Sequence, residues 1–521
     1  MSQYRYSIIK ALYNQNFISP KGIFYWIKSF MKEGLSLMAL LHFSAKLYPS
    51  KSALIYGQNE EKSYKELYED SLKLAQLLIQ CYKVKRGDQI AVLVRNHHIA
   101  VMLLPALSRI GADIHLLNTD LNASKVEEIL TTKRRFSLLI IDEELRERAL
   151  PPTPLPFTWI TTEAIDSLLS SVHNKTSSIA LPRIGRGGAF SILTGGSSGK
   201  YKEVSRKPSA TNFLPPLLAL FRQVGIQNYE STYIALPLYH GFGLATLIVS
   251  LVMGKRVWLT RRFDPEEAVR GIEKYGIEVM PLVPLMLSRM IQCPQAEQHL
   301  KSLKAIICGG DRLDRKLISH VHAAVSPIIF NLYGTSEAGF FLLATPEDLD
   351  ANSKTTLGKP IKGVKCEIRN TSSEGIGELW VSSSWAMQER RNRWQNTGDR
   401  ARKTPDGYYF HEGRQDQMVV CGGENVYPEV VERVIVEHPN VLSTKVYSES
   451  TTDGVTFLVA DIEPVKGSEI LEEELKVWLR PRLSRAEMPR KINIGKLSLL
   501  ATGKRVANQN ELKEVVNQER K

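Results

Sequence analysis

The sequence contains no pair of cysteines at the spacing of a metal-binding or redox motif. Its five cysteines are scattered and odd in number: Cys81, Cys293, Cys308, Cys366 and Cys421. A zinc site and a disulfide framework are therefore not indicated, and free thiols in a reducing compartment are the interpretation that fits. The sequence also lacks a patch of arginines interleaved with aromatic side chains, which argues against a nucleic-acid partner.

Apolar runs long enough to cross a bilayer are absent as well. The run Leu244–Met253 is too short for that purpose and is typical of a buried helix. No small-residue cleavage site follows the N-terminal segment, so a secretory signal is not indicated. These absences predict a cytoplasmic protein.

Positive charge is in excess. The 521-residue chain has 68 Lys and Arg against 55 Asp and Glu, a formal net charge of +13. The excess favours an anionic partner, such as a nucleotide, an acidic substrate or a membrane surface. Solubility alone explains it equally well. A chain of this length is expected to form roughly three domains.

The N-terminal arm, residues 1–48, mixes basic and aromatic side chains. Its apolar residues fall near helical spacing, whereas Lys28, Lys32 and Glu33 interrupt any membrane-spanning run. Two hypotheses remain open for this arm. It is an amphipathic helix that makes peripheral contact with an anionic membrane, or it is a helix docked on the body of the protein.

From about residue 50 the sequence alternates between helix and strand patterns. Ser63-Tyr-Lys-Glu66 is a capping-box start, after which Leu67, Ser71, Leu74, Leu78 and Cys81 share one helical face. Ile99–Gly111 is a second predicted helix. Predicted strands are Gln89–Val94, Leu116–Asn118, Ser137–Ile141, Tyr233–Pro237, Arg256–Thr260, Val279–Pro284, Leu303–Cys308, Ile328–Tyr333 and residues 417–421. The alternation predicts an α/β fold with mostly parallel sheets and flanking helices.

A glycine-rich stretch, Leu193–Glu203, follows a short apolar lead. Its glycines allow close approach of backbone N–H groups to a ligand, and its hydroxyl and lysine side chains suit a polyphosphate. It is not a Walker A loop, because only three residues separate Gly195 from Gly199 and Tyr201 follows Lys200. The alternative is a solvated surface loop.

Two predicted strands end in glycine and a carboxylate. One leads into Gly309-Gly310-Asp311 and the other into Gly334-Thr335-Ser336-Glu337. Ligands of open parallel sheets bind beyond the carboxyl ends of the strands, so we expect Asp311 and Glu337 on one rim. Glu337 either holds Mg²⁺ against phosphates or is a solvated turn acid. His240, at another strand end, either lines a pocket or is a packed residue.

Together these stretches resemble the adenylate-forming, AMP-binding acyl-CoA synthetase superfamily. The resemblance covers about residues 50–510 and is carried by five blocks in order: Thr194–Lys202, Pro237–Gly243, Tyr333–Glu337, Thr397–Asp399 with Gly413–Asp416, and Gly503-Lys504. Val94-Arg-Asn-His-His98 and Gly111–Asn118, with the basic arm, look most like the long-chain fatty acyl-CoA synthetases. The resemblance implies a large AMP-binding domain over 49–415 and a small mobile α+β domain over 416–521, after the arm 1–48.

The resemblance also implies roles for individual residues. Ser336, Glu337, His240 and Lys504 take catalytic positions: Glu337 binds Mg²⁺, His240 stands at the mouth of the acyl pocket, and Lys504 bridges the attacking carboxylate and the α-phosphate. Asp416 is the hinge. The residues implied to bind ATP or coenzyme A are Thr194, Gly196, Ser197, Ser198, Gly199, Lys202, Gly310, Asp311, Tyr333, Gly334, Thr335, Asp399, Arg414 and Gly423.

The chain departs from the superfamily's pattern at Gly195, Tyr201 and Glu203, where Ser, Pro and Gly are usual. Glu203 places negative charge beside a phosphate loop, which is expected to weaken binding. The expected activity is that of an ATP-dependent ligase, which activates a medium- or long-chain fatty acid as acyl-AMP and transfers the acyl group to coenzyme A. The alternatives are a ligase for aryl acids or for a carrier-protein thiol, and a catalytically decayed lipid-binding or uptake protein at the membrane.

Overall fold

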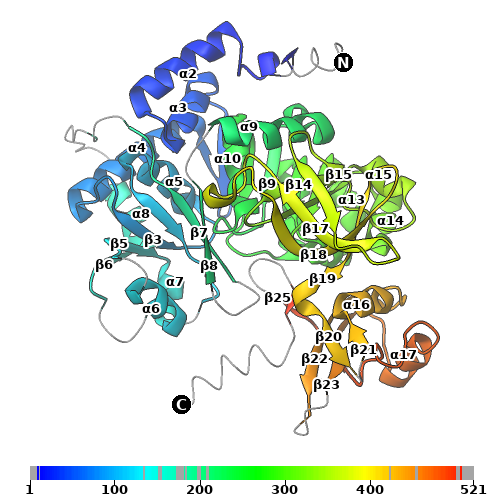
Figure 1. The fold of residues 1–521 in the computed structure, drawn as a ribbon. Helices are drawn as coiled ribbons and strands as arrows, with labels where there is room; N and C mark the ends of the chain where they lie inside the picture. The colour runs from blue at the N-terminus through cyan, green and yellow to red at the C-terminus, as the bar shows by residue number, and fades with distance from the viewer. Residues whose placement is uncertain are drawn as a thin grey trace.

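We describe the fold from a computed structural model of the 521-residue chain. The structure describes residues 9–10, 12–121, 123–132, 135–150, 155–171, 181, 185–195, 201–206, 210–421, 424–451, 456–499 and 505–506. A large body of two lobes stands above a smaller C-terminal domain (Figure 1). The predicted α/β class, with mostly parallel sheets and a smaller second domain, is confirmed.

The first lobe is built on a six-stranded sheet whose strands are parallel except for the last pair. In spatial order its strands are β6 (Thr158–Thr161), β5 (Leu138–Ile141), β3 (Gln89–Leu93), β4 (Asp113–Leu116), β7 (Phe190–Gly195) and β8 (Tyr201–Arg206). Its helices are α4 (Tyr64–Tyr82), α5 (His98–Ile110), α6 (Ala123–Thr132), α7 (Glu143–Ala149) and α8 (Thr162–Ser171). Successive residues of β3 enter two different apolar clusters, so this sheet is buried on both faces.

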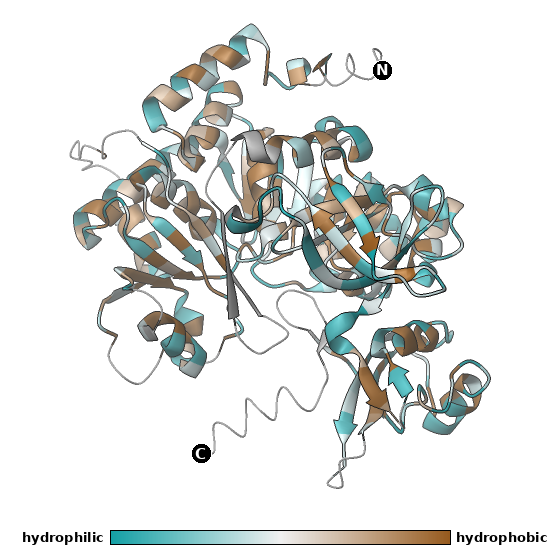
Figure 2. Cartoon of the chain, viewed as in Figure 1, coloured by the Kyte–Doolittle hydropathy of each residue, from teal (hydrophilic) through white to brown (hydrophobic). Residues whose placement is uncertain are grey.

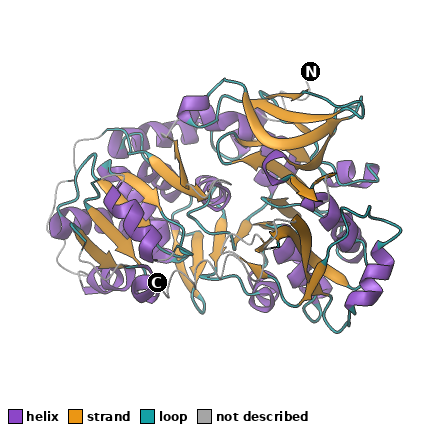
Figure 3. Ribbon diagram, turned by 60° about the horizontal axis from the view of Figure 1, so that its bottom comes forward, coloured by secondary structure: helices purple, strands orange, loops and turns teal. Residues whose placement is uncertain are grey.

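The second lobe is built on a nine-stranded sheet with a parallel centre and antiparallel edges. Its order is β15 (Lys359–Pro360), β14 (Gly339–Ala344), β13 (Ile329–Thr335), β12 (Ala305–Gly309), β11 (Val279–Leu282), β9 (Ser231–Ile234), β10 (Arg256–Leu259), β1 (Ser52–Tyr56) and β2 (Glu60–Ser63). Its helices are α9 (Ala210–Ala219), α10 (Gly241–Val252), α11 (Pro265–Tyr275), α12 (Pro284–Ile291), α13 (Ala296–His299), α14 (Arg315–Ala324) and α15 (Pro346–Ala351). Helices flank the strands of both lobes (Figure 3).

A separate antiparallel sheet leads from the large body toward the small domain. It contains β16 (Lys365–Arg369), β17 (Ile376–Ser382), β18 (Gln395–Lys403) and β19 (Tyr409–Arg414). The small domain contains β20 (Val419–Cys421), β21 (Glu424–Val426), α16 (Pro428–Val436), β22 (Val441–Ser450), β23 (Thr456–Pro464), α17 (Glu472–Leu479), β24 (Lys491–Ile494), β25 (Ser498–Leu499) and β26 (Arg505–Val506). It has an apolar cluster of its own, to which Val431 and Ile435 of α16 contribute.

The capping box at the start of α4 forms as predicted, with both of its reciprocal hydrogen bonds between Ser63 and Glu66. Cys81, the residue before the last of α4, is exposed. Some predicted strand bounds are shifted: the strand predicted to end at Pro237 ends at Ile234. The strand predicted at 116–118 lies at Asp113–Leu116. Its polar residues Asp113 and His115 interrupt the apolar run expected of a buried strand. Both form hydrogen bonds with the side chain of Gln89 on the neighbouring strand.

The N-terminal arm forms a helical hairpin of α2 (Pro20–Glu33) and α3 (Leu37–Leu47). Helix α3 is packed into the body, where Met38 and Phe43 are fully buried. Helix α2 lies outside α3 (Figure 1). Helix α3 is thus a helix docked on the body, as one of the two hypotheses for the arm states. Among the described residues, no helix has both the length and the apolarity needed to cross a membrane.

Buried polar contacts join the two helices of this hairpin to each other and to the body. The Oγ of Ser29 lies 2.7 Å from Nδ1 of His42, and both residues are fully buried. Burial, together with the positive charges of Lys32, Lys46 and Lys28, lowers the pKa of His42 to about 4. The neutral imidazole is therefore part of the folded structure at neutral pH.

We expect the free energy of unfolding to fall as the pH is lowered from 7 to 4.5. In the unfolded chain His42 binds a proton near its ordinary pKa of 6.5, whereas in the folded chain it does so only near 4. Because the unfolded state binds more protons in this window, stability decreases with decreasing pH, by about 2–3 kcal/mol for this one group. Urea unfolding of the wild type and of His42→Gln at the two pH values measures it.

The variant is expected to lose less stability between pH 7 and 4.5 than the wild type does. His320→Gln is the matched control, because His320 is exposed and is expected to leave the pH dependence unchanged. Equal losses in the wild type and in His42→Gln would show that His42 is not the group responsible.

Candidate active site

A cavity of about 3490 Å³ lies at the carboxyl ends of the central strands of the nine-stranded sheet and extends toward the small domain. Strands β12 and β13 are parallel neighbours, with Gly309 opposite Leu332. Their continuations therefore emerge side by side, and Asp311 and Glu337 both line the cavity, as the positions of the strand ends predicted.

Two glycines shape this rim for different reasons. Gly310 has a φ of +83°, a left-handed conformation that glycine adopts without strain. Gly334 sits at a register shift between β13 and β14, and a Cβ there would meet the carbonyl oxygen of Gly339 at 2.4 Å. Its missing side chain lets β14 approach, which brings Phe340 to the wall of the cavity.

A short turn carries the next two candidates, Ser336 and Glu337. The hydroxyl of Thr335 accepts a hydrogen bond from the N–H of Ala338 at 3.1 Å, and the carbonyl of Glu337 accepts one from Met387 at 2.8 Å. The turn is thus fixed by its backbone. Among the described residues, no hydrogen-bond or ion-pair partner is found for the Glu337 carboxylate, which lines the cavity. The residues described contain no cluster of three or more possible metal ligands. One carboxylate together with phosphate oxygens is a donor set that Mg²⁺ accepts, so the site fits this ion.

A hydrogen-bonded group at the cavity joins three predicted residues. The hydroxyl of Tyr333 donates to Oδ2 of Asp399, and Nη1 of Arg414 lies 3.2 Å from Oδ1 of the same carboxylate. His411 Nε2 is 3.5 Å from Oδ1. Burial would raise the pKa of Asp399, but His411, Tyr333 and Arg414 outweigh it and hold the pKa below its ordinary value. Asp399 is therefore an ionised acceptor, which takes a hydrogen bond from the hydroxyl of Tyr333.

The Arg414 side chain also reaches the predicted hinge. Its Nε and Nη2 atoms donate to the two carboxylate oxygens of Asp416, at 2.8 and 3.0 Å. This hydrogen-bonded carboxylate raises the pKa of the Arg414 guanidinium, so the group is a fixed positive charge. Asp416 lies in a short 3₁₀ turn, Gln415–Gln417, between β19 and β20. The hinge role itself stays a prediction.

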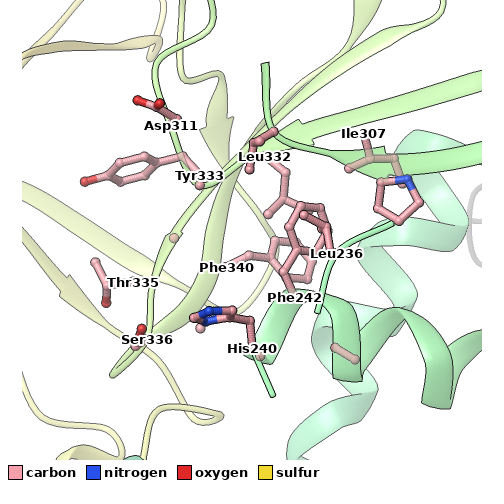
Figure 4. Close-up of a pocket in the computed structure, with 18 of the residues that line it drawn as sticks. Leu236, His240, Phe242, Ile307, Asp311, Leu332, Tyr333, Thr335, Ser336 and Phe340 are labelled. Carbon is pink, nitrogen blue, oxygen red and sulfur yellow. The ribbon is translucent and has the colours of Figure 1, made fainter. Parts of the chain in front are cut away.

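An apolar pocket adjoins the rim (Figure 4). His240 is the residue before α10, and its ring lies 4.7 Å from that of Tyr239. Phe242 and Phe340 lie next to His240 in Figure 4, and Leu236, Leu332 and Ile307 also line the pocket. Phe242 lies against the backbone of Gly309, where a Cβ would meet its ring at 3.2 Å. His240 therefore stands between an apolar pocket and the turn that carries Ser336.

Contacts between the domains hold the small domain beside this cavity. Arg289 on α12 forms an ion pair with Glu463 at 2.9 Å and donates to the carbonyl of Leu497 at 2.7 Å. Lys316 donates to the carbonyl of Pro439 at 2.7 Å. Ser498, the first residue of β25, lines the cavity, and β25 pairs with residues 505–506. The strand pair next to Lys504 in sequence thus begins at the cavity.

Several predicted residues lie outside the described residues. These are Gly196, Ser197, Ser198, Gly199, Gly423 and Lys504. Strands β7 and β8 form an antiparallel pair with Thr194 opposite Lys202 and Gly195 opposite Tyr201, so residues 196–200 connect two paired strands. The structure describes the backbone of Thr194 and Lys202 but not their side chains. Their roles stay predictions.

The sequence analysis missed His411, Glu429, Phe242 and Phe340. Glu429 lies near His411, with 3.6 Å between its Oε2 and the ring Nδ1, and burial raises its pKa while His411 opposes the shift. Phe340 on β14 and His411 on β19 belong to no motif, and the pairing of strands brings them to the cavity. Phe242 offered the one usable signal, since it follows His240 by two residues.

Comparison with known proteins places the chain in a family. The model of the family described as AMP-binding enzyme matches residues 41–389. The 2-succinylbenzoate–CoA ligase of Bacillus licheniformis is 27% identical over 466 residues, which span 86% of this chain and 93% of that protein. The corresponding ligase of Bacillus subtilis is 25% identical over 494 residues, 89% of this chain and 96% of that protein.

Solved structures share the fold. The o-succinylbenzoate CoA synthetase of Bacillus subtilis with its acyl-adenylate intermediate has a TM-score of 0.73 at 23% identity, over 90% of this chain and 97% of that one. The anthranilate CoA ligase AuaEII with anthranoyl-AMP has a TM-score of 0.77 at 19% identity, over 92% and 97%. The synthetase of Bacillus subtilis has also been solved with ATP and magnesium ion, the nucleotide and metal predicted here.

These relatives do not support the finer placement among long-chain fatty acyl-CoA synthetases, since their names specify aryl acids. They favour the aryl-acid alternative instead. The broader resemblance is confirmed, because the family match covers more than half of the sequence. The chain belongs to the family of AMP-binding enzymes.

Proposed function

We propose that this enzyme is an ATP-dependent carboxylic acid–CoA ligase that activates an aryl acid as its acyl adenylate. The observation that carries the proposal is a single cavity that joins an acidic, hydroxyl-accepting wall at Asp399 to an apolar pocket beside His240. Ser336 and Glu337 line the same cavity, and a nucleotide and an apolar acid would meet beside them. The relatives named above support the same activity.

The chemistry requires two anions to approach. An oxygen of the acid attacks the α-phosphorus of ATP, the bond from that phosphorus to the bridging oxygen breaks, and pyrophosphate leaves. No nucleophilic side chain is needed, so catalysis is chiefly positioning and charge neutralisation. Glu337 would hold Mg²⁺, and the ion would neutralise negative charge on the phosphates. Asp399 would accept from ribose hydroxyls, and the fixed charge of Arg414 would lie beside the same sugar.

The walls of the pocket support an aryl acid. Phe242 and Phe340 place two aromatic rings beside His240, and Leu236, Leu332 and Ile307 add aliphatic side chains to the pocket. Aromatic rings pack favourably on one another, by about 0.5–1.5 kcal/mol beyond the burial of their surface. A flat ring attached to the reacting carboxylate suits these walls. Coenzyme A is proposed as the acceptor in the second step, in line with the relatives' names.

We expect aryl acids to give the fastest exchange of pyrophosphate into ATP among aryl, medium-chain and long-chain acids. Phe340→Leu, which removes a ring but keeps an apolar side chain, should lower kcat/KM for the aryl acid roughly two- to tenfold. The same variant with a straight-chain acid is the matched control and should change less. The measurements are exchange rates, followed by thioester formation with coenzyme A.

Each other outcome selects a different interpretation. Faster exchange with long-chain acids would overturn the aryl proposal and restore the fatty-acid ligase. Exchange without acylation of coenzyme A would point to a carrier-protein thiol. No exchange with any acid would contradict the ligase and leave the decayed lipid-binding or uptake protein.

A further inference from the structure

Helix α2 presents an apolar face to solvent. Ile23, Phe24, Ile27 and Met31 are 48%, 60%, 56% and 71% exposed. Their spacing of three and four residues places them along one side of the helix. Figure 2 shows hydrophobic residues along this outlying helix. Large apolar side chains gathered on one exposed helical face are unusual on a surface that touches only water.

The opposite face of α2 is fixed to the body by buried polar groups. Glu33 is 2% exposed, and its Oε2 lies 2.8 Å from Nε of the buried Arg109. The hydroxyl of Tyr68 donates to the other oxygen of the same carboxylate. Because buried charges are costly to separate, these contacts prevent α2 from turning its apolar side inward. The apolar face therefore stays directed away from the protein.

The charge beside this face has one sign. Lys21, Lys28 and Lys32 are exposed on α2, and the helix contains a single acid, Glu33, which is buried in the ion pair just described. The exposed surface of the helix therefore combines apolar side chains with cations only. Aromatic residues, apolar residues and lysines on one outward helical surface are the composition of a helix that lies in the interface of an anionic bilayer.

We propose that the outward face of α2 binds the surface of a membrane that contains anionic lipids. The apolar side chains enter the boundary between headgroups and acyl chains, and the three lysines contact the headgroups. A hydrophobic protein partner would not call for three cations without an exposed acid. The proposal does not depend on which acid the enzyme activates.

The cavity of the active site extends to the inner side of the same helix. Phe17, Trp26 and Phe30 line it, and Trp26 stacks on Phe43 of α3 with 3.7 Å between ring centroids. A membrane-bound enzyme would therefore hold the apolar end of its cavity close to the bilayer. An acid that partitions into lipid would have a short way to the site.

Flotation of the full-length protein with vesicles tests the proposal. We expect the wild type to float with vesicles of phosphatidylcholine and phosphatidylserine, and to remain at the bottom with phosphatidylcholine alone. Ile27→Glu with Met31→Glu should reduce the floated fraction at least tenfold, and Lys21→Gln with Lys28→Gln and Lys32→Gln should reduce it severalfold. High salt should weaken binding of the wild type.

The matched control is Leu471→Glu with Val477→Glu in the small domain, where the exposures are 59% and 61%. This variant should float like the wild type. The changed α2 residues are exposed, so all variants should keep the melting temperature and the pyrophosphate exchange rate of the wild type. No flotation of the wild type, or equal flotation of the Ile27/Met31 variant, overturns the proposal. A dimer in sedimentation that this variant disperses would also overturn it, by showing that a second copy covers the face.

Discussion

Replacing Glu337 by glutamine is expected to slow adenylate formation by about 10²–10³-fold, the usual cost of removing one electrostatic contact to the transition state. The carboxylate lines the cavity on a turn held by Thr335 and Met387, so the substitution removes charge without moving the backbone. The rate of pyrophosphate exchange at saturating acid measures it. Because glutamine binds Mg²⁺ more weakly, raising the Mg²⁺ concentration should restore part of the activity.

Glu347→Gln is the matched control for this experiment. Glu347 is exposed on α15, ten positions farther along the sequence, and does not line the cavity. Its replacement should leave exchange within about twofold, as surface substitutions away from a site usually do. If Glu337→Gln kept more than about a third of the activity and did not respond to Mg²⁺, Glu337 would be a solvated turn acid.

Lys504→Ala is expected to lower the rate of adenylate formation by about 10²–10³-fold, because the lysine is proposed to neutralise the acid and the α-phosphate as they approach. The neighbouring strand pair supports this placement, since Ser498 on β25 lines the cavity and β25 pairs with residues 505–506. Single-turnover formation of the adenylate measures the step.

Two comparisons make this second prediction specific. Lys491→Ala, at an exposed position on β24, should leave the rate unchanged. Thioester formation from a supplied acyl adenylate should be much less affected by Lys504→Ala than adenylate formation is, because the proposed contact belongs to the first step. A loss of less than about threefold in adenylate formation would remove Lys504 from the mechanism.

Much of the fold was predictable because its determinants are local. Buried parallel strands appear in the sequence as short apolar runs, and the capping box of α4 and the proline of α16 mark helix starts. Strand β4 was misplaced because Asp113 and His115 are paired with Gln89, and no local pattern shows a pairing 24 or more positions away. Tertiary contacts therefore determine the position of β4.

The site likewise contains residues that local sequence predicts and residues that only tertiary contacts reveal. Residues that follow strand ends, such as Asp311 and Glu337, were predictable because parallel strands deliver them to one edge. His411 and Phe340 were not, since the register of antiparallel strands brings them to the cavity. The class of acid is hard to predict from the sequence for a related reason. Which acid fits a pocket depends on side chains from separate elements, here Phe242 in the first turn of α10 and Phe340 on β14.

The ion pair between Glu33 and Arg109 bears on which N-terminal residues the folded unit needs. The family match starts at residue 41, so a chain shortened to that boundary would discard Glu33 and Ser29. Arg109 would then lose the buried carboxylate that pairs with it, and removing one partner of a buried ion pair costs about 3–5 kcal/mol. That is a large part of the stability of an ordinary domain. The segment ahead of the family match therefore belongs to the unit that folds.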